Sequence, residues 1–307
     1  MTDLDICICT FRRPGVADTI RSVLAQEVPE GFALRVIVVD NDDEPTARPL
    51  VEDLSRDTPL RLLYIHHPGR NISVARNAAL DAGTARYTAF LDDDEVARPG
   101  WLMALAQART GETEVILGPV EPVYPAGSPT WMRDTVVHGT RPVRVGGAIR
   151  TGYTCNVLID RARPEIRALR FDPELGRSGG EDTDYFARMA RLGASFAYAP
   201  KAVVEEPVVP ERLSFSWLAQ RRYRMGLTHA RVLLRCHAAR PWRAVPVAAA
   251  KMLACALMAV AFTAHRGRRN AAVLRGFLHA GVVAGLSGAA PPVLYGATPH
   301  ERQGSTP

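Results

Sequence analysis

Residues 87–95 read YTAFLDDDE, an apolar run that ends in four consecutive acidic residues. Three earlier stretches, residues 4–10, 35–40 and 61–65, are also apolar, rich in β-branched residues and followed by polar side chains. Near-continuous apolar runs such as VIVV are typical of parallel strands that are buried on both faces. These four stretches therefore predict the strands of a parallel sheet.

Helical spacing separates the predicted strands. Val16, Ile20 and Val23 recur at intervals of three to four residues, and Pro14 stands just before them. Residues 73–82 predict a second helix, and Gly83 is suited to end it. Strands that alternate with helices predict an α/β fold, in which ligands bind at the carboxyl ends of the strands.

The four acids at residues 92–95 predict a metal site at one of these ends. Acidic residues after a strand can also be simple turn formers. Four like charges in one turn repel each other, however, unless a cation neutralises them. Carboxylate oxygens are ligands for Mg²⁺ or Mn²⁺, which commonly bind a nucleotide diphosphate as well.

A second polar segment, RSGGEDTD at residues 177–184, precedes a predicted helix. Glu181 and Asp182 fall in its first turn, where acidic residues are favoured by the helix dipole. They could serve only as N-terminal capping residues. Alternatively, one of them is a general base beside a substrate pocket.

Several motifs, taken in order, resemble the GT-A-fold glycosyltransferases of family 2. They are ICTFRR (8–13), VVDN (38–41), GRNISVARN (69–77), FLDDDE (90–95) and GGEDTDYFARM (179–189). The later stretch VVEEPVVPERLSFSWLAQRRYRMG (203–226) is similar to the members that build bacterial exopolysaccharides of the succinoglycan type. The resemblance covers about residues 3–230 and implies a GT-A fold with a mostly parallel central sheet.

The resemblance implies that the strand ends bind a nucleotide sugar. Thr10 and Phe11 match contacts to the nucleoside, and Asp40 matches the contact to the base, most often uracil. Arg70 and Arg76 lie where the family has basic contacts to ribose or diphosphate. The expected donor-binding residues are Thr10, Phe11, Arg12, Asp40, Arg70, Arg76, Asp92 and Asp93.

The same resemblance implies a metal site, which would hold Mn²⁺ or Mg²⁺. Asp94 matches the metal-binding acid of the DxD motif, and Asp92 matches the acid that reaches ribose or metal. Glu206 stands where the related pattern often has His. It is either a third oxygen ligand or a residue that only faces solvent.

The resemblance also implies the catalytic residues. Asp182 matches the base that takes the proton from the acceptor hydroxyl, with Glu181 near the acceptor. Three arginines of a later segment would hold the diphosphate or the acceptor: Arg221, Arg222 and Arg224.

The predicted activity is metal-dependent, inverting transfer of glucose or a related hexose from a nucleoside diphosphate, UDP first, to a saccharide or lipid-linked acceptor. The product would be a cell-surface polysaccharide or exopolysaccharide. Two alternatives remain: a nucleotidyltransferase acting on sugar phosphates, and a non-catalytic, membrane-associated nucleotide-binding protein. No nucleic-acid partner is expected, because the basic residues are dispersed and form no recognition motif.

Composition indicates a globular protein of 307 residues with a net charge of +6. Its five cysteines do not form a disulfide pattern, and Cys7 and Cys9 should share one face of a strand. The N-terminal sequence MTDLDICICT does not resemble a secretory signal, so we expect a cytoplasmic protein.

The C-terminal region contains two apolar stretches, at residues 244–264 and 271–290. Three interpretations are open: helices that lie in the membrane interface or form a shallow hairpin, a helical dimerisation or core-covering element, or a true membrane span. The first of these would place the protein at the inner face of the cytoplasmic membrane. We expect a catalytic domain at 1–235, a helical apolar extension at 236–295 and a flexible tail at 296–307.

Overall fold

The computed structural model describes residues 2–236, 243–290 and 292. Among them the chain forms two compact units: residues 2–121 with 140–206, and residues 122–139 with 207–292. The expected boundary at residue 235 differs from this division, since residues 207–235 belong to the second unit. The expected tail at 296–307 lies outside the described residues.

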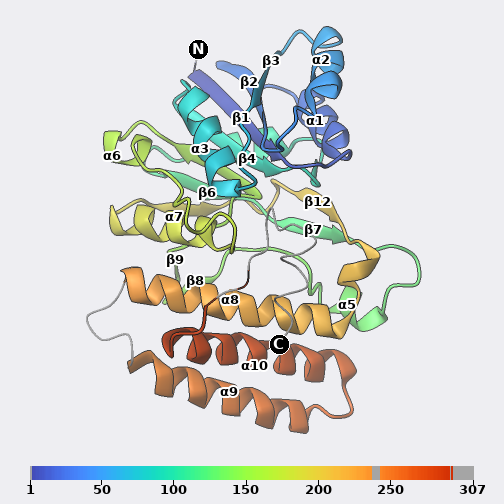
Figure 1. Cartoon of the computed structure of the whole chain (residues 1–307), viewed down its shortest axis with the longest axis vertical. Coiled ribbons are helices and arrows are strands. Elements are labelled where there is room, and N and C mark those ends of the chain that lie inside the picture. The colour runs from blue at the N-terminus through green and yellow to red at the C-terminus, as the bar shows by residue number, and fades with distance from the viewer. Residues whose placement is uncertain (1, 237–242, 291, 293–307) are drawn as a thin grey trace. The chain divides into compact units, whose positions relative to one another are not determined.

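The first unit is built on a seven-stranded sheet with the order β11-β6-β10-β4-β1-β2-β3 (Figure 1). β10 is antiparallel to both of its neighbours, and the other pairs are parallel. This confirms the predicted, mostly parallel sheet. The strands are β1 (Thr2–Thr10), β2 (Phe32–Asp40), β3 (Arg61–His66), β4 (Tyr87–Asp92), β6 (Val115–Leu117), β10 (Asn156–Asp160) and β11 (Phe196–Tyr198).

Helices cover both faces of this sheet, as the buried strand sequences require. One face packs against α1 (Val16–Leu24), α2 (Arg48–Arg56) and α4 (Trp101–Gln107). The other face packs against α3 (Ile72–Ala82), α6 (Pro164–Arg167) and α7 (Glu181–Arg191). Cys7 and Cys9 are free and buried on this second face, as predicted.

Local sequence fixes the two helices that carry site residues. The side chain of Asn71 accepts a hydrogen bond from the Val74 amide and caps α3, which ends at Gly83 as expected. α7 begins after Gly180, whose φ of +90° favours glycine. This turn fixes the residue at which α7 begins, and therefore the positions of the acids in its first turn.

The remaining strands of the chain are short. β5 (Val96–Ala97), β12 (Val204–Pro207) and β7 (Val120–Val123) form a three-stranded sheet, and β8 (Arg144–Val145) pairs with β9 (Ala148–Ile149). The β5–β12 pairing places Glu205 opposite Val96. Glu206, the next residue, is thereby held close to the acidic end of β4.

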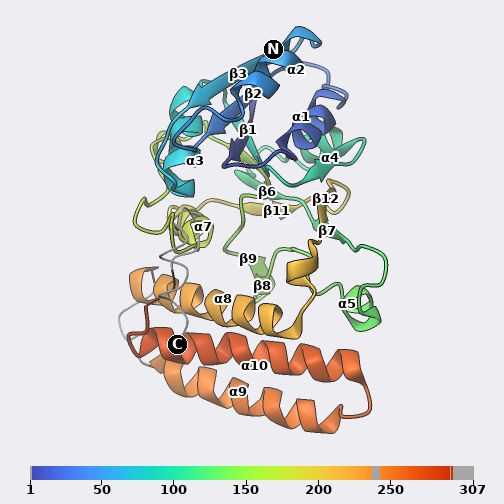
Figure 2. The same cartoon turned by 45° about the vertical axis from the view of Figure 1, so that its right-hand side comes forward.

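Helices dominate the second unit (Figure 2). They are α5 (Thr130–Asp134), the 3₁₀ helix η1 (Pro210–Arg212), α8 (Phe215–Cys236), α9 (Ala244–Ala261) and α10 (Arg266–Leu286). α10 lies between α8 and α9. Gly226 of α8 and Gly281 of α10 allow this close contact: a Cβ on either would lie within about 2.1 Å of a carbonyl oxygen of the other helix. This contact explains why α8 belongs with the apolar helices.

Candidate active site

The carboxyl ends of β1, β2 and β4 meet at one edge of the sheet. Thr10 lies opposite Asp40 in the β1–β2 register, and Cys9 lies opposite Asp92 in the β1–β4 register. The buried Thr10 hydroxyl donates a hydrogen bond to Asp93 at 2.8 Å. Residues from separate sequence motifs therefore lie together, as the α/β prediction requires.

An acidic cluster occupies this edge; we use the name for Asp92, Asp93, Asp94, Glu95 and Glu206. Burial raises the pKa of Asp92 to about 7; Arg76 opposes the shift, and other acids of the cluster add to it. Burial likewise raises the pKa of Asp93 to about 6 and that of Glu95 well above its usual value. The cluster is thus a concentration of negative charge that a cation would relieve.

The donor atoms of the cluster fit a hard divalent cation. Ligand atoms of Asp92, Glu95 and Cys155 all lie within 4.8 Å of one another. Carboxylate oxygens suit Mn²⁺ or Mg²⁺, whereas the Cys155 thiol suits them poorly because burial raises its pKa well above the usual value. The sequence places Glu95 in the acidic run at residues 92–95 but assigns it no specific role. The structure makes it a further candidate.

Arg13 is a site residue that sequence reasoning missed. Its guanidinium lies 3.4 Å from Asp93 and 3.2 Å from Asp94. The expected donor contact was its neighbour Arg12, which is directed to other acids. Both arginines follow β1 directly, so the sequence alone could not tell which one faces the acidic cluster.

Arg76 joins the acidic cluster to the first residue of α7. One guanidinium nitrogen lies 2.5 Å from Glu181 and another lies 3.3 Å from Asp92. Burial lowers the pKa of Arg76, but the two carboxylates outweigh it and the net shift is upward. We expected Arg76 to contact ribose or diphosphate. Instead the side chain is buried and held by two acids, because α3 directs it inward between β4 and α7.

The acids that begin α7 occupy different environments. Glu181 is buried against Arg76, and its second carboxylate oxygen has no hydrogen-bond partner. Asp184 is buried and paired with Arg188 at 2.8 Å. Asp182 is half-buried, and one oxygen accepts a hydrogen bond from the Thr183 amide at 2.6 Å. Of these three acids, only Asp182 is substantially open to a substrate.

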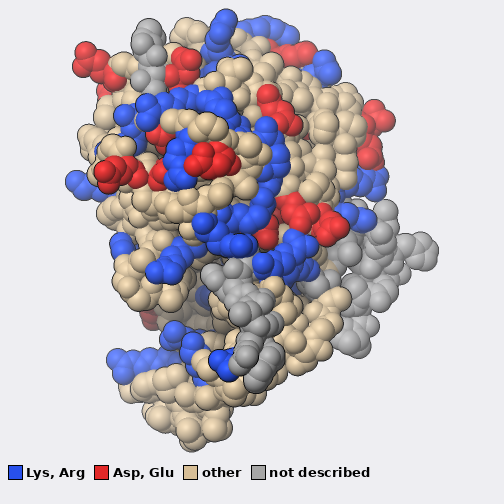
Figure 3. Space-filling model, turned by 90° about the vertical axis from the view of Figure 1, so that its left-hand side faces the viewer, with Lys and Arg blue, Asp and Glu red and all other residues tan. Residues whose placement is uncertain are grey.

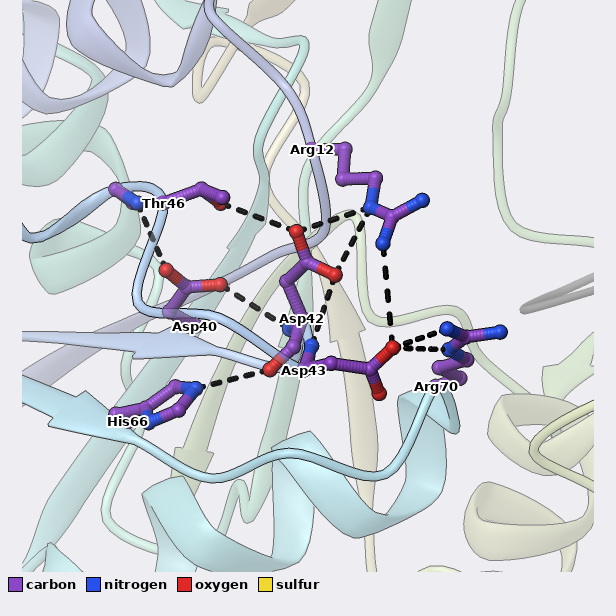
Figure 4. A network of polar contacts seen from close by, with 8 residues as sticks. Arg12, Asp40, Asp42, Asp43, Thr46, His66 and Arg70 are labelled. Atoms are coloured by element: carbon purple, nitrogen blue, oxygen red, sulfur yellow. Dashed lines mark hydrogen bonds and ion pairs between the residues drawn. The ribbon is translucent and has the colours of Figure 1, made fainter.

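Asp40 supports the loop after β2. It is fully buried, and its carboxylate accepts hydrogen bonds from the Ala47 amide at 2.8 Å and the Tyr64 hydroxyl at 3.0 Å. The Asp42 amide donates a third, at 3.2 Å (Figure 4). The carboxylate is thus enclosed and its oxygens are engaged within the protein. The expected contact between Asp40 and a base stays a prediction.

Two arginines meet at the same loop (Figure 4). Arg12 donates to Asp42 at 2.9 Å and lies over the Phe11 ring, while Arg70 pairs with Asp43. Both arginines have positive φ, +52° and +49°, which is unusual outside glycine. Strained backbone of this kind is often found at binding sites, and here it directs two cations to one place.

The three arginines expected at the diphosphate lie on α8 in the second unit. Arg222 donates to the carbonyl of Val137 at 3.2 Å, and Arg221 lies over the Trp217 ring. Both partners belong to the second unit as well. The expected contact of Arg221, Arg222 and Arg224 with a diphosphate or acceptor stays a prediction.

Comparison with known proteins agrees with this fold. The family described as Glycosyl transferase family 2 matches residues 5–164. The chain belongs to this family and is a glycosyltransferase. It is 48% identical to the succinoglycan biosynthesis protein ExoM of Rhizobium meliloti, over 96% of both chains. It is also 26% identical to a glucosyl-dolichyl phosphate glucuronosyltransferase of Haloferax volcanii, over 73% of this chain and 75% of that one.

Solved structures show the GT-A-like fold. The mannosyltransferase PcManGT from Pyrobaculum calidifontis, in complex with GDP-Man and Mn²⁺, has a TM-score of 0.63. It is 20% identical, and the match covers 92% of this chain and 86% of that one. S. aureus TarS has a TM-score of 0.53 at 17% identity, over 85% of this chain and 44% of that one.

Proposed function

We propose that the protein transfers a hexose with inversion from a nucleoside diphosphate sugar to an acceptor hydroxyl during exopolysaccharide synthesis. The observation that carries this proposal is the Arg76 bridge from Asp92 to Glu181. It places the acidic cluster and the start of α7 on two sides of one cation. A donor diphosphate and an acceptor hydroxyl need such neighbouring sites in order to react.

Asp92, Asp94 and Glu206 are the proposed ligands of Mn²⁺ or Mg²⁺, with Glu95 as a fourth candidate. When bound, the ion supplies positive charge for the diphosphate. Arg13 lies 3.2 Å from Asp94 and adds a fixed cation at the same edge. Arg12 and Arg70 are further cations for the nucleotide, held in place by their acidic partners.

Asp182 is the proposed general base. It takes the proton as the acceptor oxygen attacks the anomeric carbon from the face opposite the diphosphate, so one displacement inverts that carbon. Its side chain is half-buried, so it is partly accessible to an acceptor. Glu181 and Arg76 are positioning residues in this proposal, since each is buried and bound to the other.

UDP-glucose is the first donor to test. The succinoglycan relative supports an exopolysaccharide product, with a saccharide or lipid-linked sugar as acceptor. A lipid-linked acceptor would be met at the inner face of the cytoplasmic membrane, where we propose that the protein is peripherally bound. α9 is long and apolar enough to cross a membrane, but a core helix of a soluble protein can meet the same criterion.

A nucleotide-release assay tests the function. The purified protein is given a panel of nucleoside diphosphate sugars with Mn²⁺ or Mg²⁺, with and without a lipid-extract acceptor. We expect acceptor-dependent release of a nucleoside diphosphate, UDP first. Release of pyrophosphate from a nucleoside triphosphate and a sugar phosphate would instead indicate a nucleotidyltransferase. Donor binding without turnover on any acceptor would indicate a non-catalytic binding protein.

A further inference from the structure

α9 exposes an apolar face along its whole length. Leu253, Leu257 and Val260, spaced at three to four residues, have exposed fractions of 62%, 64% and 73%. Val247, one turn before Lys251, is also exposed. Only the opposite face, which includes Ala248 and Cys255, is buried, and it packs toward α10. Contiguous apolar surface of this kind usually marks an interaction site.

The charge of the chain is unevenly distributed around this helix. Residues 212–292 contain 13 of the 38 Lys and Arg residues and none of the 32 Asp and Glu residues. The net charge of +6 therefore arises from this segment, because acids outnumber bases in the residues before it. A segment that exposes apolar side chains and carries only basic charges is complementary to an anionic lipid bilayer.

The basic residues stand where lipid headgroups would meet the helix. Arg243 precedes α9, and exposed Arg266 and Arg268 follow it at the start of α10. Lys251 is exposed near the middle, and its long side chain can reach the headgroups while its stem lies on apolar surface. On the face shown in Figure 3, the lowest part, where Figure 1 places α9, consists of residues other than Lys, Arg, Asp and Glu.

A membrane span fits these observations less well than a surface position. Eighteen residues extend for about 27 Å, slightly less than the roughly 30 Å of a bilayer core. A span would also leave Lys251 in the hydrocarbon and arginines on both sides. The neighbouring helix α10 also does not suit a bilayer interior, because it packs against α8, which carries half-buried Arg221, Arg222 and Arg224.

We propose that the apolar face of α9 inserts into the surface of an anionic bilayer, while Arg243, Lys251, Arg266 and Arg268 bind lipid phosphates. This inference rests on the proposed membrane location. It goes further by naming the helix that inserts, the side chains that bind lipid, and the charge of the lipid. It would bring the enzyme to an acceptor whose lipid part stays in the membrane.

Vesicle co-sedimentation of the full chain tests the inference. Phosphatidylcholine vesicles that contain phosphatidylglycerol should bind the protein, and pure phosphatidylcholine vesicles or high salt should weaken the binding. Leu253→Gln with Leu257→Gln should reduce binding about tenfold or more. Val143→Gln with Val145→Gln is the matched control, because these valines are 64% and 65% exposed in the first unit. The control should bind like the parent.

The outcomes separate this inference from the proposed function. Nucleotide release on a water-soluble acceptor should be unchanged in the Leu253 and Leu257 variant, and its unfolding midpoint should match that of the parent. Unchanged vesicle binding by this variant would overturn the inference, as would equal binding to neutral vesicles. Conversion of a dimeric parent to a monomer, without vesicle binding by either, would assign the face to a second copy. Resistance of the cell-bound protein to alkaline carbonate would indicate a span and also contradict it.

Discussion

The guanidinium of Arg76 lies 2.5 Å from Glu181 and 3.3 Å from Asp92, so one buried cation connects the end of β4 to the start of α7. The two acids are far apart in the sequence. Their common partner holds the proposed metal side and acceptor side of the site in a fixed relation.

Arg76→Lys should lower turnover by roughly 100-fold, because a lysine cannot bind both carboxylates as the planar guanidinium does. Loss of this buried pairing should also reduce the free energy of unfolding by about 3 kcal/mol. Turnover is measured by nucleotide release, and stability by urea denaturation. Arg86→Lys is the control, because Arg86 is exposed and paired with Asp160. We expect this variant to lose less than about 1 kcal/mol in free energy of unfolding and to keep normal turnover. Normal turnover in Arg76→Lys would contradict the bridging role.

Asp94→Ala should weaken the Mn²⁺-dependent binding of the donor and should therefore also lower activity. Removing a carboxylate ligand should raise the Mn²⁺ concentration needed for half-maximal activity by roughly tenfold or more. Titration of the parent and the variant after chelator treatment measures this. Asp18→Ala, in an exposed part of α1, is the control and should titrate like the parent. An identical Mn²⁺ titration for Asp94→Ala would remove Asp94 from the metal site.

The acidic cluster also predicts a pH dependence of stability in metal-free protein. Burial raises the pKa of Asp92 from 3.8 to about 7, so the folded state holds a proton that the unfolded state has lost. The stabilisation is therefore complete below about pH 4 and is lost as the pH rises to about 7. Urea denaturation across this range should show a smaller decline in Asp92→Asn than in the parent. Parallel curves for the two proteins would refute the assigned shift.

Glu181→Gln should separate positioning from proton transfer. The amide keeps a hydrogen bond to Arg76 but loses the charge, so we expect roughly tenfold slower turnover with an unchanged pH profile. Asp184→Asn is a matched control in the same helical turn. It should lower the free energy of unfolding because it weakens the ion pair with Arg188, and it should leave turnover near normal. A pH profile shifted by Glu181→Gln, with Asp182→Asn still active, would make Glu181 the base.

Much of the fold follows from local sequence. Residues close together in the sequence were enough to predict the apolar runs of β1, β2, β3 and β4 and the helical spacing of α1 and α3. Each of these elements lies where it was predicted. Parallel topology also predicts that the acids which follow separate strands lie at one edge of the sheet. The α7 start was predictable because glycines precede two acids.

The partners of the site residues could not be predicted in this way. Arg76 binds Glu181 across 105 positions of sequence, and the choice between Arg12 and Arg13 depends on backbone direction after β1. Asp40 is enclosed because β3 supplies Tyr64, which no local pattern reveals. The association of α8 with α10 likewise depends on glycines that are far apart in the chain.

The most direct test of the central claim compares donor binding and sugar transfer in Asp182→Asn. Calorimetric titration with UDP-glucose and Mn²⁺ should give an affinity within about threefold of the parent, since the side chain is proposed to act only on the acceptor. Transfer, measured as acceptor-dependent UDP release, should fall by roughly 100- to 10,000-fold. Transfer at near the parental rate would show that the acid at the start of α7 is not the base, and that the acidic cluster works without it.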